Sequence, residues 1–272
     1  MYPAKRGFRK ILLVIIFLIL LPAPLLSAFL QIAPSAKLSS VAEIEGLSPE
    51  PASIFYNPAL FTGNFSLSLT HYSLFSLGDI SYNNLVASFA IGRFPITAGI
   101  QIFGNEKYQE QTFILGSNFE IMDNFVLGLD CRLLNLDVKT IESRMAFQLD
   151  GGIYASAQDW KFSVSFSNIT FSMIDKDDLP QECRTSIIYK ISPHIETGIS
   201  AVKEIGYDFS FRLGVVYFPI EKLGIMSGVQ THPERFSAGI ELQLSRFIID
   251  YALKTHHYLE LTHYLTITYR LF

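Results

Sequence analysis

Apolar and polar residues alternate with a period of two along most of the chain beyond residue 64. In segment 125–133 the odd positions carry Phe, Leu or Cys, and the even positions include Asp130 and Arg132. Successive side chains of a strand point to opposite faces, so this pattern predicts β-strands with one apolar and one polar face. The same alternation recurs in three later segments: 145–156, 237–244 and 265–271.

Short turn-like sequences divide this region into pairs of strands. The predicted hairpins lie near 65–91, 96–121, 125–157, 160–191, 195–218, 223–244 and 247–272. The connections inside these hairpins are longer and more polar: 104–110, 135–144, 168–181, 203–207, 231–235 and 255–260. Short turns that alternate with longer loops are typical of a membrane barrel. The sequence therefore predicts an all-β, transmembrane antiparallel barrel of about 14 strands.

A sheet that spans a bilayer must close on itself, because hydrocarbon offers no partner to an unpaired backbone group. Its apolar face then contacts lipid and its polar face lines the lumen. The alternative is a water-soluble barrel with an apolar interior, but fourteen strands enclose more space than side chains fill. Charges of both signs are predicted in the lumen, which favours internal ion pairs over a charge-selective pore: Asp130, Arg132, Asp150, Arg184, Lys190, Arg212, Glu241, Asp250 and Arg270.

The N-terminal 28 residues have the pattern of a secretory signal peptide. A basic region precedes the apolar run 11–21, two prolines follow it, and small residues at 27–28 offer a cleavage site. The alternative is an uncleaved anchor helix over 11–30, although the apolar run is shorter than the roughly 20 residues that a membrane span needs. Cleavage would leave 17 basic and 25 acidic residues, a net charge of −8, which argues against a nucleic-acid partner.

The amino-acid composition agrees with a chain that presents an apolar surface to lipid. Charged residues make up 17% and apolar residues 49%, with a mean hydropathy of +0.30. A soluble domain usually carries about 25% charged residues. Cys131 and Cys183 could in principle pair after export, but they are predicted to point outward from non-adjacent strands, so two free cysteines are favoured.

Motifs for catalysis or metal binding are weak. His256, His257 and His263 lie near Glu260 and suggest a surface metal site, but without a recognised ligand spacing a solvated loop is favoured. Acidic residues at 175–178 lack the spacing of a calcium loop. No phosphate-binding, dinucleotide-binding or serine-hydrolase motif is present in the sequence. We therefore expect no enzyme activity, no cofactor and no bound metal.

Both ends of the chain contain recognisable segments. Residues 29–33 read Phe-Leu-Gln-Ile-Ala, and 52–60 contain Tyr-Asn-Pro-Ala. Near the C-terminus, Arg-Leu-Gly at 212–214, Ser-Ala-Gly at 237–239 and Asp-Tyr-Ala at 250–252 precede a final Phe272. Together these resemble the PorV/PorQ group of outer-membrane proteins, relatives of the FadL-type channels for hydrophobic compounds.

The resemblance implies three segments: a signal peptide at 1–28, an N-terminal plug or entry segment at 29–63 in or near the lumen, and an outer-membrane barrel at 64–272. It implies protein export with cargo shuttling, as in type IX secretion. The alternatives are a FadL-like channel for small hydrophobic solutes and a structural barrel without transport. The implied partners are outer-membrane lipid, the insertion machinery that reads a terminal Phe, and secreted cargo or hydrophobic small molecules.

The Asn-Pro-Ala box has two interpretations from its residues alone. Pro58 fixes its own φ and favours an extended Asn57, whose amide can bond backbone groups. One interpretation is a rigid turn into the first strand. The other is a hatch or plug that contacts a ligand, with Phe55, Tyr56, Asn57 and Pro58 as the candidate residues.

Overall fold

The computed structural model describes residues 28–61, 63–139 and 141–271. Residues 1–27 of the predicted signal peptide and the terminal Phe272 therefore lie outside the described residues. The strands of the described chain are β1 (Ser66–Ser73), β2 (Ser81–Ile91), β3 (Phe94–Gly104), β4 (Tyr108–Met122), β5 (Phe125–Val138), β6 (Ile141–Ala157), β7 (Trp160–Ser167), β8 (Met173–Ile174), β9 (Asp177–Asp178), β10 (Glu182–Ser192), β11 (Ile195–Glu204), β12 (Ser210–Ile220), β13 (Leu223–Gln230), β14 (Arg235–Leu244), β15 (Phe247–Lys254) and β16 (Thr262–Arg270).

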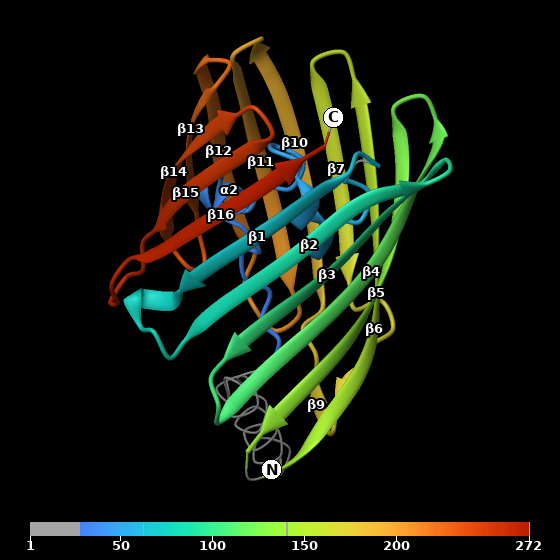
Figure 1. Cartoon of the computed structure of the whole chain (residues 1–272), viewed down its shortest axis with the longest axis vertical. Coiled ribbons are helices and arrows are strands. Elements are labelled where there is room, and N and C mark those ends of the chain that lie inside the picture. The colour runs from blue at the N-terminus through green and yellow to red at the C-terminus, as the bar shows by residue number, and fades with distance from the viewer. Residues whose placement is uncertain (1–27, 62, 140, 272) are drawn as a thin grey trace, which may run out of the picture.

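Fourteen of these strands form one closed antiparallel barrel (Figure 1). Each pairs with its neighbours in chain order, except that β7 pairs with β10, and β1 closes the barrel against β16. The small pair β8–β9 lies in the connection between β7 and β10. The predicted fold class and the seven hairpins are confirmed.

The barrel wall is apolar outside and polar inside, as the alternation predicted. On β1, Leu67 and Leu69 are exposed, whereas Ser68 and Thr70 are buried. A closed sheet whose outer face is apolar satisfies its backbone internally and suits a bilayer. The apolar-interior alternative is wrong, because the large exposed side chains are on the outer face. Within the described residues, no helix combines the length and apolarity needed to cross a bilayer.

The two ends of the barrel differ. Two-residue turns such as Gly92–Arg93 and Gln158–Asp159 connect strands at the end near the C-terminus, which we name the turn end. The longer connections, including β8–β9, lie at the opposite, loop end. Two predicted loops are wrong: 104–110 shortens to 105–107, and 135–144 shortens to 139–140, because the strands continue beyond the lipid-facing region.

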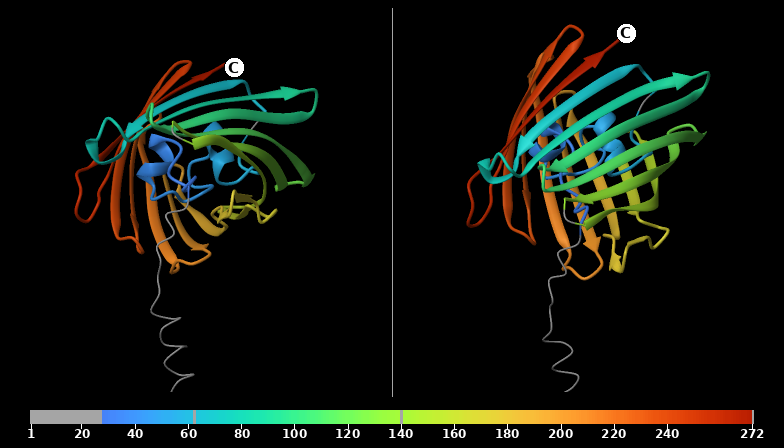
Figure 2. Two further views of the ribbon diagram at one scale, coloured as in Figure 1. Left: turned by 90° about the horizontal axis from the view of Figure 1, so that it is seen from below. Right: turned by 60° about the horizontal axis from the view of Figure 1, so that its bottom comes forward.

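The N-terminal segment lies inside the barrel (Figure 2). It contains the short helix α2 (Ala36–Ser40) and the 3-10 helix η1 (Pro51–Phe55); another 3-10 helix, η2 (Leu74–Ser76), follows β1. We name residues 28–61 the plug. Almost every plug residue from Ala33 to Phe61 is buried. Val41, Ile44 and Leu47 pack against wall residues in a small apolar cluster, so the lumen has an apolar core of its own.

Candidate functional site

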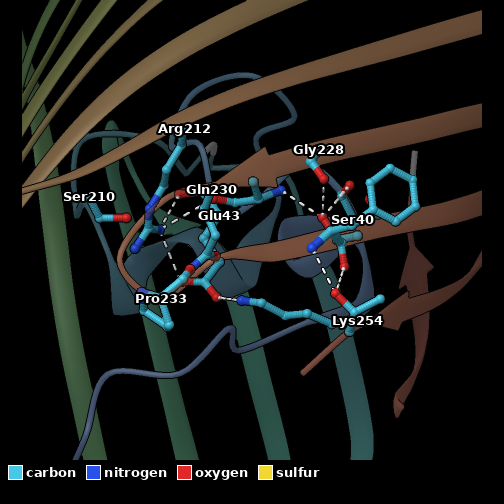
Figure 3. Close-up of polar contacts among 12 residues, drawn as sticks. Ser40, Glu43, Ser210, Arg212, Gly228, Gln230, Pro233 and Lys254 are labelled. Carbon is cyan, nitrogen blue, oxygen red and sulfur yellow. Dashed lines mark hydrogen bonds and ion pairs between the residues drawn. The ribbon is translucent and has the colours of Figure 1, made fainter. Parts of the chain in front are cut away.

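The candidate site is the lumen, where three polar groups attach the plug to the wall. The first group is centred on Glu43 (Figure 3). Its carboxylate forms ion pairs with Lys254 of β15 and, at 3.0 Å, with Arg212 of β12. Tyr56 also donates its hydroxyl to this carboxylate at 3.0 Å. Burial opposes ionisation, but Lys254, Arg212 and Arg184 together hold the pKa of Glu43 well below its ordinary value.

Arg184 connects this group to the rest of the plug. Its guanidinium lies 3.8 Å from the centre of the Tyr56 ring, within the range of a cation–π interaction. It also forms an ion pair with Glu182 on its own strand. The Arg184 side chain is fully buried, so its charge is compensated by the acids and the ring around it.

The second group attaches α2 to the C-terminal strands. Lys37 forms a 2.6 Å ion pair with Glu241 of β14. The backbone N–H of Ala36 donates to the Thr266 hydroxyl at 2.9 Å, and Ser35 pairs with Glu50 within the plug. Ser237 donates to the Ser40 carbonyl at 3.1 Å. The helix α2 is therefore fixed to β14 and β16.

The third group lies on the opposite side of the lumen. Arg132 pairs with Asp130 and Asp150 on the wall and donates to the Phe55 carbonyl at 2.9 Å. It is a wall-to-plug contact in which a cation is shared by two acids. All three charged side chains are buried, which fits the ion pairs expected from the mixed charges in the sequence.

The Asn57 amide group is hydrogen-bonded to the wall through its nitrogen and to the plug backbone through its oxygen. Its Nδ2 donates to the Ser163 hydroxyl at 2.8 Å and to two strand carbonyls, and its Oδ1 accepts from the Ala59 N–H at 2.8 Å. The partners of Nδ2 are on β6 and β7, whereas the bond from Ala59 is a local contact within the box. The box therefore makes both a local turn contact and contacts that attach the plug to the wall.

Two glycines leave the room that the box occupies. Gly128 on β5 and Gly152 on β6 are paired across the strands and face the lumen. A Cβ on Gly152 would overlap the Asn57 side chain, and one on Gly128 would overlap the backbone of Pro58 and Ala59. The close approach of plug and wall therefore requires glycine at both positions.

A small pocket remains at the loop end of the plug. Its volume is about 30 Å³, which is the space of about one water molecule. Plug residues 29–32 lie beside it, with Phe55 and Tyr56 further along. From the wall, Tyr82 and Phe103 contribute rings that stack with centroids 4.2 Å apart. The pocket combines aromatic surface with the polar side chains of Gln101, Glu110, Arg132 and Gln148.

A larger hollow of about 610 Å³ opens at the turn end. There the β3–β4 ladder begins only at Ile96 and Ser117, so Phe94 and Pro95 have no ladder partner on β4. Pro95 has no N–H to donate, although its carbonyl accepts from the Ser117 hydroxyl at 2.8 Å. The rings of Phe94 and Phe119 cover this part of the wall and meet edge to face, with their centroids 6.0 Å apart. Plug residues Leu60 and Phe61 line the hollow from inside.

The structure brings most of the predicted site residues together. Phe55 and Tyr56 line the small pocket, and Asn57 and Pro58 contact the wall. Of the predicted lumen residues, those buried against the plug or paired with it are Asp130, Arg132, Asp150, Arg184, Arg212, Glu241 and Asp250. Lys190 is exposed. Arg270 lies instead at the turn-end mouth, where it lines a second hollow of about 380 Å³.

Other sequence hypotheses find less support. Among the described residues, no group of three His, Cys, Asp or Glu side chains could hold a metal ion. His263 bonds the Tyr251 hydroxyl and not the neighbouring histidines. Asp175 forms an ion pair with Arg144. Cys131 and Cys183 are free.

Sequence reasoning missed the charged residues of the plug itself. Lys37, Glu43, Glu45 and Glu50 supply its charges, whereas the candidate residues predicted in this segment were only Phe55, Tyr56, Asn57 and Pro58. A signal was present, because Arg212 on the lumen face has no acid directly across from it: its register partners are Ser200 on β11 and Gln230 on β13. The inward-facing glycines were a second signal, since each marks a place where backbone approaches the wall.

Comparisons with known proteins identify the fold and no sequence relative. No family model and no curated protein matches this chain. The Ralstonia pickettii toluene transporter TbuX is similar in structure with a TM-score of 0.63 and 11% identity, covering 86% of this chain and 98% of its own. The CymD monoaromatic hydrocarbon channel is similar with a TM-score of 0.68 and 9% identity, and the match covers 90% of this chain and 99% of CymD. A Pseudomonas aeruginosa FadL homologue has a TM-score of 0.63 and 12% identity, and the match covers 89% of this chain and 99% of the homologue.

Proposed function

We propose that this protein is a channel for small hydrophobic molecules, with the plug as its closure. The observation that carries the proposal is the arrangement of the lumen: the plug separates an aromatic-lined pocket at the loop end from the hollow between β3 and β4 at the turn end. Phe55, Tyr56, Asn57 and Pro58 are then closure residues, and the ion pairs of Glu43, Lys37 and Arg132 hold the closure in place.

The filled lumen supports a gated path over a permanently open aqueous pore. The loop-end pocket is smaller than any organic solute, so passage requires displacement of plug residues around Phe55 and Tyr56. The pocket offers stacked rings, which suit an apolar or aromatic solute better than an ion. Two of the structural neighbours are a toluene transporter and a monoaromatic hydrocarbon channel, which agrees with this class of solute.

The turn-end hollow provides an exit through the wall. It has both lumen-facing residues such as Asn118 and lipid-facing residues such as Phe94 and Phe119 along its lining. A solute that separated the Phe94 and Phe119 rings would pass from the lumen to lipid without crossing water. This route is energetically favourable for an apolar molecule, because transfer from water to hydrocarbon is driven by the hydrophobic effect.

The proposed location is the bacterial outer membrane, where a barrel with an apolar outer face is stable. We propose no catalytic step. Export of protein cargo, which the PorV/PorQ resemblance implied, has no support from the sequence comparisons. Transport of hydrophobic solutes is therefore the better-supported function.

A reversible cross-link between plug and wall tests the proposal. A Cβ built on Gly46 would lie 3.6 Å from Cβ of Ser163 on β7, within the range that a disulfide needs. We would combine Gly46→Cys and Ser163→Cys in a chain whose two natural cysteines are replaced by serine. Uptake of labelled toluene would be measured in cells that lack their own hydrophobic-solute channel, with each single cysteine variant as a control.

The expected result is uptake that falls at least fivefold in the oxidised double variant and returns after reduction. Oxidation should not change the uptake of either single variant, which separates the cross-link from the substitutions. Each single variant supplies its own baseline, because Ser163→Cys removes the hydroxyl that binds Asn57 and Gly46 has a φ of +82°. Equal uptake in oxidised and reduced protein, with the disulfide verified by mass spectrometry, would contradict movement of the plug. Uptake no greater than in cells without the barrel would overturn the proposed function as a whole.

A further inference from the structure

The start of the plug is bound by a buried carboxylate at the loop end of the barrel. The backbone nitrogen of Phe29 donates to Oε2 of Glu110 at 2.8 Å, and the other carboxylate oxygen accepts from the Tyr108 hydroxyl. Glu110 belongs to β4 and is only 7% exposed. The Glu110 carboxylate of the wall therefore binds the backbone nitrogen of Phe29 in the plug.

Glu110 has no cationic partner among the described residues. Arg132 lines the same pocket, but Asp130, Asp150 and the Phe55 carbonyl engage its guanidinium. A buried carboxylate without a cation is unfavourable, because two neutral hydrogen bonds replace little of its lost hydration. The position next to the Phe29 nitrogen therefore favours a positive charge.

The backbone at Phe29 points to the source of that charge. Its φ is +61°, a left-handed conformation that is uncommon for a bulky residue. This torsion exists only while the carbonyl carbon of Ala28 is attached to the Phe29 nitrogen. The sequence places small residues at 27–28, after the apolar run and the prolines at 22 and 24, so Ala28 supplies the small residue that a cleavage site has immediately before the cleaved bond.

We propose that the chain is cleaved between Ala28 and Phe29, and that the new α-ammonium group of Phe29 forms a buried ion pair with Glu110. Hydrolysis of this peptide bond adds the hydroxyl of water to the Ala28 carbonyl and a proton to the Phe29 nitrogen. The resulting primary amine takes up a further proton near neutral pH, because an α-amino group has a pKa of about 8. Cleavage would also remove the torsional restriction at Phe29.

This ion pair would hold the free end of the plug beside the loop-end pocket. Residues 29–32 line that pocket directly, so their position decides how much of it is open. The inference goes beyond the proposed function, since it concerns how the plug is completed and is independent of what the channel carries. It assigns Glu110 as the receptor of a processed N-terminus.

The first experiment identifies the N-terminus. The full chain, expressed with its own leader and purified in detergent from outer membranes, would be analysed by intact mass and N-terminal peptide sequencing. We expect Phe29 as the first residue. A mature chain that begins at any other residue would overturn the proposal, whatever the transport activity of the protein.

The second experiment measures the charge state of the amine. The rate at which acetic anhydride acetylates the Phe29 amine would be followed from pH 6 to 10 by mass spectrometry of the N-terminal peptide. Folded protein would be compared with the same protein in urea, and with Glu110→Gln. Glu106→Gln is the matched control, because Glu106 is exposed in the adjoining β3–β4 connection.

An ion pair raises the pH at which the amine loses its proton, whereas burial without a counter-charge lowers it. We expect the midpoint pH of acetylation for the folded wild type to lie at least one unit above the midpoint in urea. Glu110→Gln should lower the midpoint of the folded protein by at least one unit, which is a tenfold loss of proton affinity. Glu106→Gln should leave it unchanged. A folded midpoint at or below that in urea would overturn the ion pair, and this comparison stands even where Glu110→Gln does not fold.

Discussion

The carboxylate of Glu43 in the plug lies between Lys254 of β15 and Arg212 of β12, and it forms ion pairs with both. The three side chains are buried, so removal of the acid leaves two positive charges without water or a counter-ion. This geometry makes Glu43 the residue on which the attachment of the central plug depends most.

Replacement of Glu43 by Gln is expected to loosen the plug. Loss of one partner of a buried ion pair typically costs about 3–5 kcal/mol. Urea unfolding in detergent micelles measures this cost, and single-channel recording in a planar bilayer should show openings that the wild type lacks. The double variant Glu43→Gln/Lys254→Met should be less destabilised than the sum of the single variants. Strict additivity would contradict a direct interaction between the two residues.

Gly152→Ala is expected to displace the Asn57 amide from the wall. The added methyl group would overlap the Asn57 side chain, which would lose its bonds to Ser163 and to the strand carbonyls. We expect a loss of about 1–3 kcal/mol, typical of overpacking and of a lost buried hydrogen bond. Protease cleavage within the plug, followed by mass spectrometry, should become faster.

Gly151→Ala is the control for this change. It adds the same methyl group one residue away, on the lipid-facing side, where the nearest side-chain atom is 3.6 Å distant. It should leave plug cleavage unchanged. Similar effects of the two alanines would show that the strand backbone, and not the Asn57 contact, is the cause.

Stability is expected to fall as pH rises from about 4.5 to 7, because of Glu45. Burial raises the pKa of this plug residue from 4.5 to about 7, against the opposing effects of Arg184 and the Ser165 hydroxyl. Over this range the unfolded chain releases the proton while the folded chain retains it, so the unfolded state is favoured progressively. The change approaches about 3 kcal/mol and levels off above pH 7.

The urea midpoint of wild type and Glu45→Gln at pH 4.5, 5.5, 6.5 and 7.5 isolates this effect. The variant cannot release a proton at this position, so the difference between the two proteins should grow with pH over the window. Glu43 acts in the opposite direction, but only below about pH 4.5, where its lowered pKa makes protonation favour unfolding. A difference that does not depend on pH would exclude titration of Glu45.

A charge on the outer wall should interfere with membrane insertion. Ile199 lies on the outer face of β11 and is 55% exposed. Arginine there is expected to cost about 2–4 kcal/mol near the bilayer midplane. Ile205, in the connection that follows β11, gives the matched control as Ile205→Arg. Folding into phosphatidylcholine vesicles, followed by heat-dependent gel mobility, should be impaired only by Ile199→Arg.

The sequence predicted the wall well because the wall obeys a local rule. Period-two alternation in 125–133 and 237–244 assigns each residue to a face without knowledge of distant partners. Loop lengths were less predictable: residues 135–138 and 141–144 are polar enough to resemble a loop, yet they extend β5 and β6. Strands that continue beyond lipid lose the apolar outer face by which they were recognised.

The interior could be predicted only in part. The signs of Asp130, Arg132 and Asp150 indicated ion pairs, and Arg132 does pair with both acids. The partners of Arg212 and Glu241 were not predictable, because Glu43 and Lys37 reach them across the lumen from a segment without periodicity. Such contacts depend on how the plug is threaded, which no pattern within one strand encodes.

The helix α2 has consequences for the order in which the molecule assembles. Ala36 donates a hydrogen bond to Thr266, which is 230 residues further along the chain. Lys37 forms an ion pair with Glu241 of β14, in the hairpin before the last. The part of the chain that leaves the ribosome first therefore finds its partners among the strands that leave it last. The pairing of β1 with β16 and the docking of the plug then occur together, late in folding. The barrel closes around a plug that is already inside it.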